Sequence, residues 1–104
     1  MSEAMRYEDF LARQASRCDL RLGVGDAAEA AFQAVLSEVG ERKEKQGFEN
    51  FTLLFRAEPA GAPQQGMHVV TFTDGVQQEI FLVPVARAGE QVDYEAIFNR
   101  AIVT

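Results

Sequence analysis

The chain has 104 residues, of which 47% are hydrophobic and 25% are charged, and its formal net charge is −6. A chain of this length and composition predicts one globular domain over residues 1–104 with one core. The negative charge disfavours binding to a phosphate backbone or an anionic membrane, because both need a basic surface. We therefore expect partners that are neither nucleic acids nor membranes.

The cysteine count and the N-terminus predict a cellular location. Cys18 is the only cysteine, so no internal disulfide can form, and a reducing compartment is expected. The first ten residues lack the apolar core of a secretion signal, and no apolar run approaches the roughly 20 residues of a membrane span. These features predict a cytoplasmic protein.

Two short elements are expected near the N-terminus. Tyr7, Phe10 and Leu11 recur at spacings of three and four, which predicts a short amphipathic helix over residues 7–15. Residues 18–22 alternate strictly between apolar and polar side chains, which is typical of a strand with one buried face. A glycine turn over residues 23–26 follows.

The alanine-rich segment Ala27–Val39 is compatible with two structures. Its residues have high intrinsic helix propensity. Its alternation also permits a strand, with Phe32, Ala34 and Leu36 on one face. The residues alone leave helix and strand nearly equal.

The second half of the chain has the pattern of an antiparallel meander. Apolar segments rich in Val, Ile, Thr and Phe alternate with turn residues, as strands do. Asp74-Gly75 joins two of these segments and predicts a hairpin with a two-residue type I′ turn. Residues 40–47 are expected to form a charged, solvated loop, and residues 58–66 a proline-rich loop. The predicted strands cover residues 48–57, 67–73, 76–84 and 92–100.

The strand pattern also predicts the core. Aromatic residues from Phe48 to Phe98 fall mostly on alternating strand faces, which is typical of a filled barrel. If some of them lined an open barrel mouth, a ligand pocket would result. Pro84 belongs at a bulge, a strand end or an edge, because it donates no hydrogen bond. The residues expected to share one core are Phe51, Leu53, Phe55, Phe81, Val83 and Phe98.

Five segments along the chain carry a resemblance when they are taken in order. They are Tyr7–Phe10, Phe51–Arg56, Gln65-Gly66, Ile80–Val85 and Tyr94–Asn99. Together they resemble a family of small bacterial proteins classed as a domain of unknown function. The resemblance implies a mostly antiparallel barrel or rolled sheet with an N-terminal helix, and a strand for residues 29–39. Some members occur beside genes for phage-tail-like collar proteins, which implies a structural or assembly role.

One short motif is typical of a nucleotide-binding site, but the residues that follow it disfavour such a site. Residues 23–28 form a G-x-G-x-x-A string after an apolar strand, as a dinucleotide site requires. Such a site also needs a second buried parallel strand ending in an acidic residue, and residues 41–45 at that place are wholly polar. We expect a plain glycine turn.

Metal, thiol and carboxylate sites are disfavoured in the same way. His68 is the only histidine, too few ligands for a transition metal, and is expected on a solvated strand face. Cys18 is expected to be a buried small hydrophobe. Glu79 and Asp93, with Glu95, flank strands and are expected to be solvated. Arg56 is expected to pair with Glu95 or Glu58 at the rim of the sheet.

These expectations combine into one hypothesis on fold and function. The fold is mainly β, a small antiparallel six-strand barrel or rolled sheet with a short N-terminal helix. No catalytic, cofactor-binding or metal-binding residue is predicted. The function expected is that of a non-enzymatic protein-interaction or structural module, accessory to a phage-tail-like assembly, whose partner is another protein or a second copy of the chain. The alternative is a small-ligand-binding barrel, and a weaker one is an enzyme that uses carboxylates alone.

Overall fold

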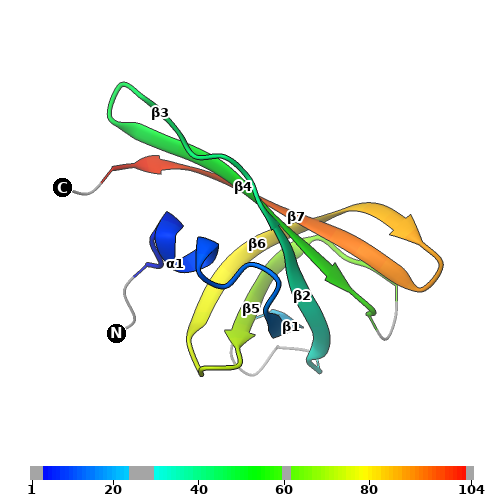
Figure 1. Ribbon diagram of the computed structural model, residues 1–104. Helices are drawn as coiled ribbons and strands as arrows, with labels where there is room; N and C mark the ends of the chain where they lie inside the picture. Colours follow the sequence, from blue (N-terminus) through cyan, green and yellow to red (C-terminus); the bar gives the residue numbers. More distant parts are fainter. Residues whose placement is uncertain (1–3, 24–29, 60–61, 103–104) are drawn as a thin grey trace.

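A computed structural model describes residues 4–23, 30–59 and 62–102. These residues form a short helix and a set of strands (Figure 1). In chain order the elements are α1 (Tyr7–Leu11), β1 (Arg17–Leu22), β2 (Phe32–Val39), β3 (Lys43–Lys45), β4 (Phe48–Ala57), β5 (Gly66–Phe72), β6 (Gln77–Ala88) and β7 (Gln91–Ala101).

The strands form a closed antiparallel barrel. Six of them follow one another in the order β2-β1-β5-β6-β7-β4, and the pairing of β2 with β4 closes the ring. β3 lies outside the ring and pairs with the first three residues of β4. The predicted fold class, a mainly β six-strand barrel with a short N-terminal helix, is confirmed.

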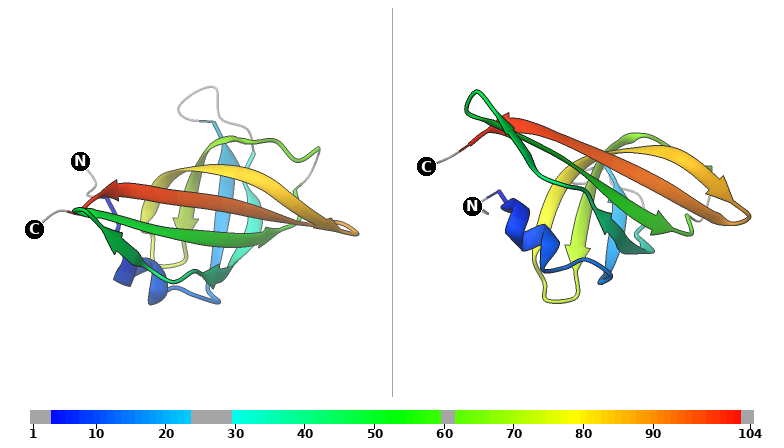
Figure 2. Two further views of the ribbon diagram at one scale, coloured as in Figure 1. Left: turned by 90° about the horizontal axis from the view of Figure 1, so that it is seen from above. Right: turned by 45° about the horizontal axis from the view of Figure 1, so that its top comes forward.

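Two long strands, β4 and β7, continue beyond the barrel. β6 pairs with β7 only from Val83 onward, so in the described chain β7 has no strand partner on that side after Glu95. The projecting part consists of β3, the first half of β4 and the second half of β7, and we call it the arm. Figures 1 and 2 show α1 lying beneath the arm, on the side toward the barrel.

The barrel interior is filled by the inward-facing side chains of every strand in the ring. Phe51, Leu53 and Phe55 of β4 are buried as expected, and Phe98 is partly buried against them. Alternation of apolar and polar residues produces this pattern, because successive side chains of a strand point to opposite sides of the sheet. The most deeply buried side chains are Phe10, Leu20, Leu36, Leu53, Phe55, His68, Val70, Leu82, Val92 and Tyr94.

One predicted face is wrong. Phe81 is 51% exposed, while its neighbours Ile80 and Leu82 are buried, so the face assigned to Phe81 and Val83 points outward. The run Ile80–Val83 is apolar at every position and carries no alternation of its own. Glu79 shares the face of Phe81, and its charge is the signal that the outer face begins there.

The predicted hairpin forms, but its turn differs from the predicted type. β5 pairs with β6 around Asp74-Gly75. The Gly75 N–H donates to Phe72 O (2.9 Å), and the Phe72 N–H donates to Val76 O (2.9 Å), which makes a three-residue loop. Gly75 has φ = 87°, whereas Asp74 keeps a negative φ. A three-residue loop with a final left-handed glycine needs one positive φ, not the two of a type I′ turn.

The remaining expectations have mixed outcomes. Residues 32–39 form a strand, so the helix alternative is wrong for this part; residues 24–29, with most of the glycine turn, lie outside the described chain. The loop expected at 40–47 contains β3, because its charged residues complete a ladder along the edge of β4. The α-helix ends at Leu11 rather than residue 15, and Ala15 instead donates to Leu36 O of β2. Pro84 lies at a β-bulge of β6, as predicted.

Candidate functional site

His68 lies inside the barrel, not on a solvated face as expected. It is 1% exposed, and its ring lies 5.7 Å from the Tyr94 ring and 6.3 Å from the Phe32 ring, measured between centroids. Nδ1 lies 2.9 Å from Gly66 O. Burial lowers the pKa of His68 below its ordinary value of 6.5, so the neutral ring is favoured. The alternation of β5, with Val70 and Phe72 inward, would have placed His68 inward too.

Cys18 has the environment expected of a structural residue. It is 4% exposed, opposite Ala34 of β2 and Phe72 of β5. Burial, together with the charge of Asp19, raises the pKa of the Cys18 thiol to about 12. A nucleophilic cysteine needs a lowered pKa, so this side chain is an inert part of the core.

A cluster of four charged residues at the arm is paired throughout, and its members are Arg42, Glu44, Glu49 and Arg100. Glu49 accepts hydrogen bonds from Arg42 Nε (2.6 Å) and Arg100 Nε (2.7 Å), and the bonds to Arg42 and then Arg100 hold the pKa of its carboxyl below the ordinary value of 4.5. Arg42 also bonds Glu44 (2.6 Å). Arg100 donates to Met5 O (2.7 Å), so the cluster joins the arm to the segment that precedes α1. Its role is structural.

The other titratable residues that the sequence suggested are not brought together. Arg56 Nε lies 3.1 Å from Asp93 Oδ1, so the partner is Asp93 rather than Glu95 or Glu58. Arg56 lies directly opposite Asp93 in the β4–β7 register, and this position decides the pairing. Within the described residues, no three His, Cys, Asp or Glu side chains are placed to hold a metal ion. The strand after the glycine turn, β2, runs antiparallel to β1, which differs from the parallel arrangement that a dinucleotide site requires.

An open pocket of about 600 Å³ lies on the outside of the barrel, over β1, β2, β4 and β5. Its lining mixes polar and apolar side chains and includes charges of both signs. Side chains that point away from the core dominate it, such as Arg17, Asp19, Gln33, Arg56 and Glu58. A typical small-molecule site is lined mainly by apolar side chains. The pocket is open to solvent and has charges of both signs in its lining, so it is a weaker candidate for a ligand site than an enclosed apolar cavity.

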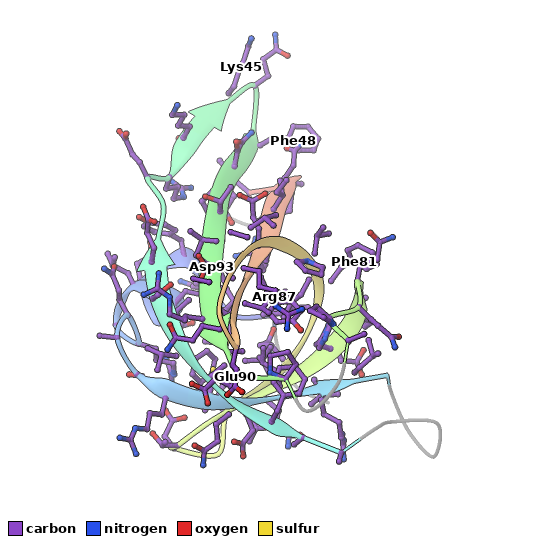
Figure 3. The ribbon with its side chains drawn as sticks, turned by 90° about the vertical axis from the view of Figure 1, so that its right-hand side faces the viewer. Lys45, Phe48, Phe81, Arg87, Glu90 and Asp93 are labelled. Carbon is purple, nitrogen blue, oxygen red and sulfur yellow. The ribbon has the colours of Figure 1, made fainter. Side chains whose placement is uncertain are left out.

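The most distinctive surface is apolar and lies on the opposite side of the arm from α1. We define the outer apolar face by Phe48, Met67, Phe81 and Ile97, which are 50%, 42%, 51% and 73% exposed. Figure 3 shows Phe48 and Phe81 projecting from the same side of the molecule. Met67 lies directly opposite Phe81, on β5 and β6. Large exposed apolar side chains that share one face mark interaction surfaces more often than isolated ones do.

Sequence reasoning missed two residues of this face. Ile97 precedes Phe98, which was expected in the core, so its outward direction follows from the alternation of the strand. Met67 alternates with His68 in the same way. The signal was present, but it depended on the direction of each strand, and the wrong direction was predicted for β5, whose His68 was expected outward, as well as for β6.

Comparison with known families gives one match. The model of a family described as Domain of unknown function (DUF6916) matches residues 5–98. The chain belongs to this family. No curated protein and no solved structure matches the chain. The resemblance to a domain-of-unknown-function family is confirmed at that level, and the family's description assigns no activity.

In the described part of the chain, no helix is long and apolar enough to cross a membrane.

Proposed function

We propose that this domain is a non-enzymatic protein-interaction or structural module that binds another protein through the outer apolar face. The observation that carries the proposal is the exposure of Phe48, Phe81 and Ile97 on one side of the molecule. Interface cores are enriched in aromatic residues, and two of the four residues of this face are phenylalanines. The filled barrel interior supports the same proposal, since it leaves the surface to make contacts.

The proposal extends to the setting in which the protein acts. The resemblance to small bacterial proteins, some encoded beside phage-tail-like collar proteins, supports an accessory role in such an assembly. A lone cysteine, Cys18, suits a reducing compartment, and we propose a cytoplasmic location on that ground. The net charge of −6 supports a protein partner over nucleic acid or an anionic membrane.

The test is affinity capture from the native cell with matched surface variants. We expect wild-type protein and Gln33→Glu to capture the same partner, whereas Phe81→Glu captures none, because a carboxylate would be buried in the contact. Gln33 is exposed and lies in the open pocket, so this variant adds the same charge elsewhere. Equal capture by Phe81→Glu contradicts the proposal. So does saturable 1:1 heat on calorimetric titration with zinc, ATP or NAD.

The alternative of a small-ligand-binding barrel has one observation in its favour, the open pocket of about 600 Å³, which has the volume of a ligand site. It differs from the barrel-mouth pocket that was first considered. Screening small polar molecules by NMR would test it, with chemical-shift changes confined to residues such as Asp19 and Gln33 as the expected result.

A further inference from the structure

Three of the four residues of the outer apolar face, Ile97, Phe81 and Met67, lie in rows that cross the strands. Residues directly opposite each other in an antiparallel pair lie on the same side of the sheet. Ile97 of β7 lies opposite Thr52 of β4, and Met67 of β5 lies opposite Phe81 of β6. β6 and β7 pair as far as Val83↔Glu95, and Phe81 and Ile97 each lie two residues beyond this pair, on their own strands. The Thr52–Ile97 row and the Met67–Phe81 row thus lie on the outward side of the sheet, on either side of the place where β6 and β7 separate.

Two residues of opposite charge, Lys43 and Glu38, lie along the edge of β4, one on each side of the Thr52–Ile97 row. Two residues toward the tip of the arm, Asn50 lies opposite Lys43 of β3. Two residues toward the barrel, Leu54 lies opposite Glu38 of β2. Lys43 and Glu38 are exposed, and the ion pairs formed among the described residues include neither of them. Lys43 and Glu38 thus lie on the same edge of β4, at equal distances from Thr52 and with opposite charge.

We propose that the outer apolar face binds a second copy of the chain. The inference rests on the proposed function, because it assigns an occupant to the same face. A two-fold axis along the Thr52–Ile97 row stacks the two faces with their strands running in opposite directions. Ile97 then packs against its own symmetry mate, and Lys43 of each copy lies over Glu38 of the other.

Charge complementarity is what favours a second copy over an unrelated protein. Each copy has a net charge of −6, so two copies repel each other unless the contact itself matches charges of opposite sign. The Lys43 row and the Glu38 row match each other only when the face is inverted along the strands, which a two-fold axis does. Such an isologous contact is the commonest form of protein self-association.

Sedimentation velocity of the whole chain, at concentrations from roughly 1 to 300 µM, tests the inference. We expect a dimer for wild-type protein and for the control Gln33→Glu. Ile97→Glu should be monomeric, because the axis brings its two introduced carboxylates together. Circular dichroism of each variant verifies the fold. A dimer that persists in Ile97→Glu overturns the inference.

Exchanging the two charges tests the predicted contact between Lys43 of one copy and Glu38 of the other. Both residues are exposed, so the substitutions should leave the fold of each copy intact. Lys43→Glu alone and Glu38→Lys alone should each weaken the dimer by about tenfold or more, since two attractive contacts become repulsive. The two changes in one chain restore opposite charges and should recover the wild-type dimer. Absence of this recovery overturns the inference.

The outcome for wild-type protein separates this inference from the proposed function. A wild-type chain that stays monomeric overturns the second copy. If that monomer still captures another protein, and Phe81→Glu abolishes the capture, the proposed function stands without the dimer. If neither the dimer nor the capture depends on the face, both are wrong.

Discussion

The two sides of the arm differ although the same strands build them. On the inner side, the rings of Phe51 and Phe98 stack with their centroids 4.7 Å apart, and Phe10 of α1 packs on both. On the outer side, Phe48 is 50% exposed and Ile97 is 73% exposed. Both sides of these strands carry large apolar side chains, and the described chain supplies a helix that covers one side. Coverage, rather than hydrophobicity, separates core from surface here.

The charged residues of the arm show the same contrast. On the inner side, Glu49 lies between two arginines, and Arg100 also stacks over Phe51 and Phe98 at 5.4 and 5.2 Å. A buried carboxylate is tolerated only when it is paired and hydrogen-bonded in this way. On the outer side, Lys43 is exposed to solvent. On the inner side the charged residues are paired and the aromatic rings are covered. The outer side has exposed apolar side chains and an exposed charge that another molecule could contact.

Removing Phe10, the side chain by which α1 packs on the inner side of the arm, should have the largest effect on stability. We expect Phe10→Ala to lower the free energy of unfolding by about 3–4 kcal/mol, because Phe10 is 1% exposed. The adjacent Leu11 is 47% exposed, so Leu11→Ala should change the free energy by about 0.5 kcal/mol or less. Urea unfolding of both variants measures the difference. Equal losses would show that α1 does not seal the inner side.

The buried carboxylate provides the next largest effect. Glu49→Gln should lower the free energy of unfolding by about 1–3 kcal/mol, because it removes the charge that pairs with Arg42 and Arg100 and replaces one of the two acceptor oxygens by an NH2 donor. Glu44→Gln, a change at an exposed partner of Arg42, serves as the control and should cost far less. The pKa of Glu49 is lowered in the folded state, so its stabilisation is present above pH 4.5 and is lost as the pH falls below that value. The gap between wild type and Glu49→Gln should therefore narrow in acid.

The titration of His68 should change the stability of the fold by less than the loss of Glu49 does, and in a higher pH range. The pKa of His68 is lowered in the folded protein, so protonation favours the unfolded state. Its contribution to stability is present above pH 6.5 and is lost as the pH falls through the lowered pKa. His68→Gln removes this titration, and its melting temperature should change less than that of wild type between pH 7 and pH 5. Parallel profiles would contradict a buried neutral imidazole.

Substitutions on the outer side should have the smallest effect on stability. Phe81→Ala should cost about 1 kcal/mol or less, because half of the side chain is already exposed. Had Phe81 been in the core, as its sequence suggested, the cost would be about 3–5 kcal/mol. Thermal melting at low protein concentration measures the monomer and separates the two values. A large loss would mean that Phe81 packs inside the barrel.

The sequence alone determined most of the barrel. The alternation in residues 18–22 and 48–57 predicted β1 and β4, since a half-buried strand leaves a period of two in its sequence. Asp74-Gly75 located the hairpin, because a left-handed glycine needs no tertiary support. Both signals are local, and both correspond to elements of the structure.

Only the tertiary structure decided the direction of β6, the burial of His68 and the separation of the arm into a covered and an uncovered side. An unbroken apolar run such as Ile80–Val83 fits either direction, and the choice depends on its register with β5 and β7. The pairing of Arg56 with Asp93 likewise depends on the β4–β7 register. Ile97 is exposed because α1 covers the other side of its strand, and a pattern of residues does not record where a helix docks.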